Sequence, residues 1–238
     1  MRTPSFLLSL TLFAPLAVAD RAPSSTRATP PTPPAAGKAQ PRAPGAPAVA
    51  ATPPAPPPVR LAPIDLATVP EACQSLAKQA VAPTLQVALS ARVSLASCLA
   101  EHAVSPLELC DCGDSVAAID KAVAPAIALL DDVVDNADPA TQMIAEHTEG
   151  ELYAGFSLRL LATLPKLASE AAEAEQSLRD LRKQTLEAQL TPWREAAMTA
   201  FQHVVELSKD HPAAAALPVV AAAVRDSEQR LAADVAAR

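Results

Sequence analysis

The residues of this chain whose type and spacing best suit disulfide formation or metal binding are four cysteines: Cys73, Cys98, Cys110 and Cys112. An even number of cysteines in a chain that carries an export signal is typical of structural disulfides. If Pro83 turns the chain back on itself, the start of the helix before it meets the end of the helix after it. We therefore predict a helical hairpin with the cysteines gathered at one end and joined in two disulfides.

The pairing of these cysteines is left open between two solutions. A bridge between Cys110 and Cys112 is disfavoured because a ring closed across a single residue is strained. We expect Cys98–Cys110 together with Cys73–Cys112, or the swapped pairs. Each bridge would need Cα atoms roughly 4.4–6.8 Å apart, and each would contribute about 2–4 kcal/mol by restricting the unfolded chain.

A metal site is the alternative use of the same residues. Cys98 and His102 stand four residues apart and share a helix face. Together with Cys110 and Cys112 they form a possible tetrahedral set for zinc or copper. The spacing is not that of a zinc finger, and oxidation competes for the thiols. We expect disulfides and no bound cofactor.

A polar ridge is the second constellation. His147, Glu151 and Arg159 follow one another at multiples of four residues and so share a helix face. Such a set suits acid–base or anion-binding chemistry, but ordinary surface ion pairing is the more common use. The chain has no Glu-x-x-His, His-Glu-x-x-His or Gly-x-Ser-x-Gly pattern and no phosphate-binding glycine loop. We predict that it is not an enzyme.

The amino terminus has the three parts of a secretory signal peptide. Arg2 gives a positive start, residues 6–18 are almost entirely apolar, and Ala17-Val18-Ala19 is a small-residue cleavage site. The apolar run is shorter than the roughly 20 residues that span a bilayer. We assign residues 1–19 to a cleaved signal peptide, with an uncleaved membrane anchor as the alternative, and we expect no transmembrane segment after cleavage. The protein is then exported, to the periplasm or the extracellular space.

Residues 20–63 have the composition of a spacer. More than half of the 25 prolines lie here, mixed with Ala, Thr and Ser and with no aromatic residue. Proline fixes φ and lacks an amide donor, so this segment cannot build helices or sheets. We predict a disordered, polyproline-biased linker.

Residues 64–238 have a different character, and we assign them to one acidic domain. All acids but Asp20 fall there, and Lys121 is the only Lys or Arg between Arg92 and Arg159. An acidic surface repels phosphates, so nucleic-acid binding is disfavoured, whereas a cationic partner fits. About 175 residues are enough for one hydrophobic core. Because aromatic residues are few, that core must consist of Ala, Leu, Val and Ile.

Helical periodicity dominates this domain and predicts an all-α bundle of about five to six helices. Thr68 and Glu71 form a capping-box pattern before the first helix, and Asp114, Asp138 and Thr191 suit later helix starts. The expected helices run from residue 69 to about 81, 84 to about 103, 114 to about 136, 138 to about 188, 191 to about 208, and 213 to the end.

The longest predicted helix carries a heptad seam. Apolar or small residues recur at spacings of three and four from Leu160 to Ala188, among them Leu164, Leu178 and Leu181. The seam is short and diluted by alanine, so we expect it to pack inside the domain as an antiparallel hairpin. A coiled-coil dimer is the alternative, which leaves monomer and dimer undecided.

These observations favour an exported, non-catalytic helical protein that acts as an interaction or structural module of the bacterial envelope. The alternative is a Cys/His metal-binding or redox-responsive envelope module. The partner is an unknown protein or envelope component.

Overall fold

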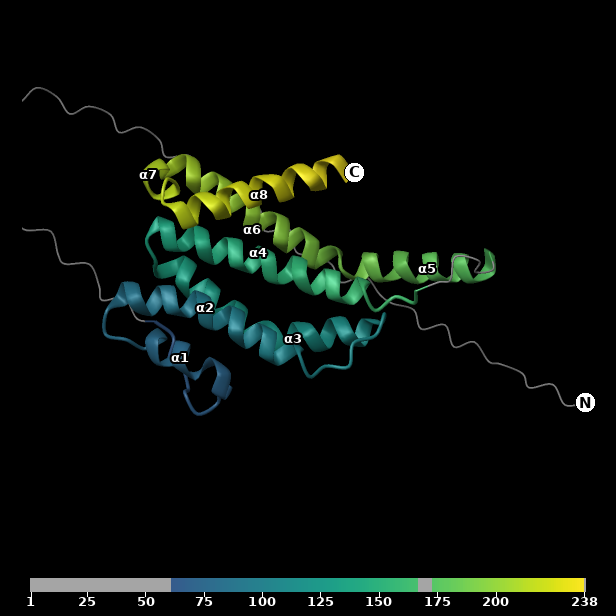
Figure 1. Ribbon diagram of the computed structural model, residues 1–238, viewed down its shortest axis with the longest axis horizontal. Helices are drawn as coiled ribbons and strands as arrows, with labels where there is room; N and C mark the ends of the chain where they lie inside the picture. The colour runs from purple at the N-terminus through teal and green to yellow at the C-terminus, as the bar shows by residue number, and fades with distance from the viewer. Residues whose placement is uncertain (1–60, 167–172, 238) are drawn as a thin grey trace, which may run out of the picture. The chain divides into compact units, whose positions relative to one another are not determined.

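The computed structural model describes residues 61–166 and 173–237, and in these ranges the chain forms eight α-helices and one short 3-10 helix with no strand (Figure 1). The all-α prediction is therefore confirmed for the described residues. The predicted signal peptide and residues 20–60 of the predicted spacer lie outside them. The elements are η1 (Glu71–Cys73), α1 (Gln74–Ala80), α2 (Leu85–Val104), α3 (Gly113–Asn136), α4 (Pro139–Leu161), α5 (Glu173–Gln189), α6 (Thr191–Asp210), α7 (Pro212–Ala215) and α8 (Pro218–Ala237).

The helices begin close to the predicted positions, but Asp138 is the only predicted capping residue that acts as one. Asp114 and Thr191 lie inside the first turns of α3 and α6, whose N-cap residues are Cys112 and Leu190. Asp138 accepts hydrogen bonds from the amides of Ala140 (3.0 Å) and Thr141 (3.3 Å), which caps α4 as expected. The predicted capping box is wrong. The Thr68 hydroxyl donates instead to the carbonyl of Asp65 at 2.9 Å, and the helical chain begins with the 3-10 turn at Glu71.

The long fourth helix of the prediction is two helices. α4 ends at Leu161, and α5 begins at Glu173. Pro165 lies between them, where its missing amide and its ring oppose a continuous helix. The predicted seam is divided as a result: Leu160 and Leu164 are buried, whereas Leu178 and Leu181 on α5 are exposed. Pro218 divides the last predicted helix in the same way, giving α7 and α8.

The core lies around α4, which contacts α2, α3, α6 and α8 (Figure 1). It is built mainly of Leu, Val and Ala, with three large aromatic side chains fully or almost fully buried: Phe156, Trp193 and Phe201. Burying a Leu or Phe side chain stabilises the fold by roughly 1.5–3 kcal/mol. The Trp193 indole donates to the Asp120 carboxylate at 2.6 Å, so its one polar atom is satisfied.

A buried ion pair between α2 and α3 also binds the first described residues of the chain. Arg92 on α2 is only 2% exposed, and its guanidinium contacts the Asp132 carboxylate on α3 at 2.5 Å and donates to the Ala62 carbonyl at 2.6 Å. Burial lowers the pKa of Arg92, and Asp132 partly offsets that effect. Residues 61–63, which the sequence assigns to the spacer, therefore pack against α2 and α3.

Among the described helices, α2 alone is long and apolar enough to cross a membrane. The core helix of a globular bundle meets the same test. Half of the apolar window of α2 is buried within the bundle, and the helix carries the Arg92 ion pair on its inner side.

Gly150 sets the approach of α4 to α6. A Cβ atom at this position would lie 2.5 Å from Cε1 of the Phe201 ring and 2.8 Å from Cζ. Those distances are well inside van der Waals contact, and Phe201 is fully buried. Only glycine lets the ring lie directly on the α4 backbone. Gly155, one turn further along α4, has no such neighbour within 4 Å.

We therefore predict opposite outcomes for two identical substitutions in α4. Gly150→Ala should lower the free energy of unfolding by about 1–3 kcal/mol, because the new methyl group overpacks the core. Gly155→Ala should raise it by about 0.5–1 kcal/mol, because alanine favours a helix and the site has room. Urea denaturation measures both changes. Equal effects at the two positions would contradict the assigned contact.

Candidate functional site

The cysteines form two disulfides that differ from the expected pairs. Cys73 bonds to Cys98 with Cα atoms 5.9 Å apart, and Cys110 bonds to Cys112 with Cα atoms 5.3 Å apart. The hairpin argument correctly places the start of the first helix against the end of α2. The expected pairings are nevertheless wrong, because Cys73 faces Cys98 directly inside one apolar cluster. That contact leaves the two loop cysteines to each other.

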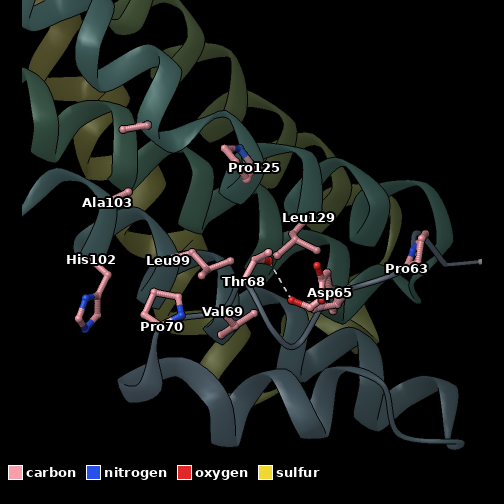
Figure 2. A pocket seen from close by; sticks show the side chains of 12 residues that line it. Pro63, Asp65, Thr68, Val69, Pro70, Leu99, His102, Ala103, Pro125 and Leu129 are labelled. Atoms are coloured by element: carbon pink, nitrogen blue, oxygen red, sulfur yellow. Dashed lines mark hydrogen bonds between the residues drawn. The ribbon is translucent and has the colours of Figure 1, made fainter.

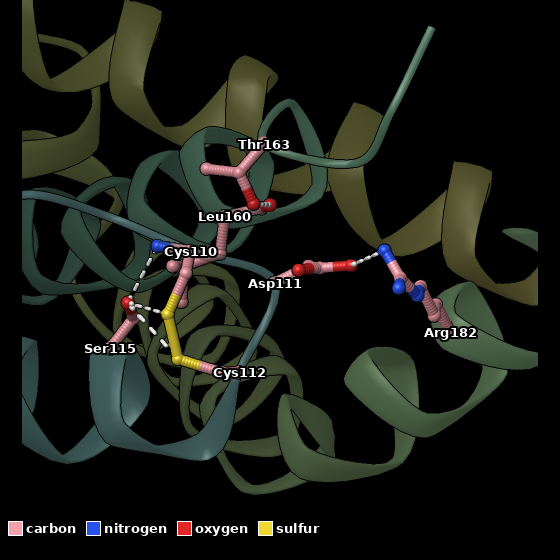
Figure 3. The surroundings of a disulfide bond; sticks show 7 residues. All are labelled: Cys110, Asp111, Cys112, Ser115, Leu160, Thr163 and Arg182. Carbon is pink, nitrogen blue, oxygen red and sulfur yellow. Dashed lines mark hydrogen bonds and ion pairs between the residues drawn. A yellow bond between two sulfur atoms is a disulfide. The ribbon is translucent and has the colours of Figure 1, made fainter. Parts of the chain in front are cut away.

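The Cys110–Cys112 disulfide lies in the loop before α3 (Figure 3). The buried hydroxyl of Ser115 accepts from the Cys110 amide at 2.8 Å and lies 3.2 Å from the Cys110 sulfur and 3.8 Å from the Cys112 sulfur. Between the cysteines, Asp111 makes a long ion pair of 3.7 Å with Arg182 of α5. Its buried carboxylate oxygen has no hydrogen-bond partner, so the contact is a charge interaction only.

The predicted zinc or copper set is not assembled. Cys98 is bonded to Cys73, and all four cysteines are in disulfides, so no thiolate remains as a ligand. His102 is exposed on α2. It stands at the edge of a different feature, the pocket described below.

The polar ridge is divided between two neighbours. His147 contacts Asp226 of α8 at 3.1 Å between Nε2 and Oδ2, and Glu151 forms an ion pair with Arg230 of α8 at 2.6 Å. Arg159 turns instead to Glu101 of α2, at 2.6 Å. Two of the three predicted residues therefore contact α8 and the third contacts α2.

Two residues of the ridge, together with Asp226 of α8, have the spacing of possible metal ligands. Among the residues described, His147, Glu151 and Asp226 are the only three potential ligands whose donor atoms all lie within 4.8 Å of one another. Arg230 already lies against both carboxylates, 2.6 Å from Glu151 and 3.4 Å from Asp226. An ion would have to displace this guanidinium. We interpret the group as an ion-pair clasp between α4 and α8.

A second cluster of titratable groups lies on the next face of α4. Burial raises the pKa of Glu149 to about 7, and the negative charges of Glu146 and Asp131 add to the effect. Burial also raises the pKa of Glu146, although His203, 3.4 Å away, lowers it. Tyr153 has a raised pKa for the same reason, burial first and then the charge of Glu149. The cluster therefore holds a proton close to neutral pH.

A pocket of about 440 Å³ lies between the first described residues and helices α2 and α3. Figure 2 shows His102 at one end and Asp65 near the other, with the apolar side chains of Leu99 and Leu129 between them. The Thr68 hydroxyl donates to the Asp65 backbone carbonyl, and the Asp65 carboxylate accepts from the Ala67 amide at 3.0 Å, so both polar side chains already have partners within their own turn. The pocket therefore has little that would orient a reacting substrate.

The sequence did not identify Asp226 and Arg230 of α8, or Glu149 of α4, as members of these clusters. Asp226 lies 79 positions from His147 along the chain, so no local pattern connects them. Glu149 lies outside the ridge spacing, but Glu146 and Glu149 are three residues apart on one helix face. Two like charges at this spacing repel each other, and this is the feature of the sequence that could have indicated a raised pKa.

Comparison with protein-family models, with curated proteins and with solved structures finds no match for this chain.

The raised pKa of Glu149 predicts that the free energy of unfolding depends on pH. Burial raises its pKa in the folded protein from the ordinary value of 4.5 to about 7, so the folded state keeps a proton that the unfolded state releases between about pH 4.5 and 7. The free energy of unfolding must then fall as pH rises through that window. Glu149→Gln should raise stability at about pH 8.5 and change it little at about pH 4.

Chemical denaturation at both pH values measures this effect. Glu195→Gln, on the exposed side of α6, is the matched control and should change little at either pH. A Glu149→Gln variant with the same stability change at both pH values would show that burial does not shift this carboxyl.

Proposed function

We propose that this protein is an exported, non-catalytic interaction module of the bacterial envelope, and that it associates with a second copy of itself through α5. The signal sequence supports export, and the two disulfides fit an oxidising compartment. The observation that carries the proposal is the exposed apolar stripe of α5, a helix that projects beyond its neighbours in Figure 1.

α5 buries a single side chain, Leu186, against the bundle. Leu178 and Leu181 are 53% and 60% exposed, and they lie on a different side of the helix from Leu186. Ala174 and Thr185 extend the same stripe by one heptad step on either side. A stripe with this spacing is the seam of a two-helix coiled coil that has no partner within the described chain.

A second copy fits this stripe in an antiparallel arrangement. With the symmetry axis between Leu178 and Leu181, each of these residues lies opposite the other in the second copy, and Ala174 lies opposite Thr185. A symmetric contact of this kind uses the same patch on both subunits. Alanine and threonine at the outer layers let the two helices approach closely.

The charges beside the stripe favour the same arrangement. Glu175 and Arg182 are seven residues apart and flank the stripe on one side. In the antiparallel pair, Glu175 of each copy comes beside Arg182 of the other. Glu175 has no ion pair among the described residues. Arg182 is 48% exposed, and its 3.7 Å contact with Asp111 leaves part of the guanidinium available.

The association should be weak. α5 has 17 residues, a length of roughly 25 Å at 1.5 Å per residue. Only two leucines per copy lie at its centre. Interfaces below about 1,200 Å² are typical of transient complexes. We therefore expect a reversible dimer that forms at micromolar or higher concentrations.

Sedimentation equilibrium of the mature chain tests the proposal. The wild type should show a monomer–dimer equilibrium, and Leu178→Glu with Leu181→Glu should abolish it. Val235→Glu, at an even more exposed apolar residue on α8, should leave it unchanged. A wild type that stays monomeric up to about 0.5 mM, beyond the range of weak complexes, would overturn the proposal.

A charge exchange tests the antiparallel register. Glu175→Arg and Arg182→Glu should each weaken the dimer by placing like charges together, and the double variant should restore it. Asp111→Asn controls for the contact of Arg182 within its own chain. A double variant weaker than both single variants would rule out this pairing.

A further inference from the structure

The two disulfides differ in burial and in loop length. Cys73 is fully buried, Cys98 is half-buried, and their bond closes a sequence separation of 25 residues. Cys110 is exposed in the loop before α3, and its bond to Cys112 spans a separation of 2. A long loop restricted by a buried bond stabilises a fold, whereas so short a loop restricts the unfolded chain very little.

We propose that the Cys110–Cys112 disulfide is a thiol–disulfide exchange site, and that Cys73–Cys98 is purely structural. The proposed partner is a protein or small molecule with thiol groups. Exchange at a disulfide requires access for the attacking thiolate and a leaving sulfur that is stable as a thiolate. The loop meets both requirements, one at each cysteine.

Cys110 supplies the access. The residue is exposed, whereas Cys112 is half-buried, so we expect an incoming thiolate to attack the Cys110 sulfur. This attack forms a bond from the partner sulfur to Cys110 and breaks the bond between Cys110 and Cys112. The bonding electron pair leaves with Cys112 as a thiolate.

Cys112 supplies the leaving group. It is the N-cap residue of α3, a helix of 24 residues. Free amides and the positive end of the helix dipole stabilise a thiolate at this position. The Ser115 hydroxyl lies 3.8 Å from its sulfur and can turn to donate. Asp111 and Asp114 oppose the effect with negative charge, and Arg182 offsets the first of them at 3.7 Å.

The second step completes the exchange. Another thiol of the same partner attacks the partner sulfur in the mixed disulfide and releases Cys110. The partner loses two electrons and two protons and becomes a disulfide, and Cys110 and Cys112 gain them as thiols.

The loop should survive this change. The Cys110 amide donates to Ser115, and the Ser115 amide donates to the Cys112 carbonyl at 3.2 Å, whether or not the sulfurs are bonded. These contacts keep the two thiols close together, so the bond can form again.

The test is timed reduction of the mature chain with dithiothreitol, quenched by alkylation and followed by intact mass and fragment-ion mapping. Two labels should appear on Cys110 and Cys112 at least about tenfold faster than on Cys73 and Cys98. Helicity measured by circular dichroism should be unchanged at that stage. The Cys73→Ser/Cys98→Ser variant should keep the fast phase, and Cys110→Ser/Cys112→Ser should lose it.

Glutathione tests the direction of attack. After brief exposure to reduced glutathione and rapid alkylation, glutathione should be found on Cys110 and the label on Cys112. Glutathione found mainly on Cys112, four thiols appearing together, or labelling of Cys73 and Cys98 first would each overturn the proposal.

Discussion

The close contact between α4 and α6 is the constraint on which the rest of the bundle depends. A core with so few aromatic side chains gains its packing from short distances between helices, and Gly150 allows the Phe201 ring to lie against the backbone of α4. α4 can then contact α2, α3, α6 and α8 at once. The His147 clasp and the Glu149 cluster both lie on this central helix, so their geometry follows from its position.

Charge is distributed unevenly over this framework. Arginines connect different helices by ion pairs: Arg92 joins α2 to α3, Arg159 joins α4 to α2, and Arg230 joins α8 to α4. Acids outnumber bases, and Glu146 and Glu149 of α4 lie near Asp131 of α3, where burial and these negative charges raise the pKa of Glu149 to about 7. Ion pairs thus reinforce the fold at some positions, whereas buried like charges oppose it at others.

α5 and the loop before α3 both present exposed residues at the surface of the described chain. α5 buries one side chain, and the loop carries an exposed cysteine. The two are neighbours, because Arg182 of α5 contacts Asp111 between the cysteines. Association through α5 and thiol exchange in the loop are separate proposals. Because the two elements are in contact, binding at α5 would take place close to the Cys110–Cys112 disulfide. Elements with few buried contacts are generally the ones free to interact.

The sequence alone determined the fold class, most helix boundaries and the hairpin that brings the first helix to the end of α2. Helix periodicity, proline breaks and Asp138 capping are local, so they can be read without a structure. It did not determine the break between α4 and α5, the pairing of the cysteines, or the partners of His147 and Glu151. Those depend on which helix faces meet. Asp226 and Arg230 come from a helix almost eighty residues away, and only tertiary packing decides such contacts.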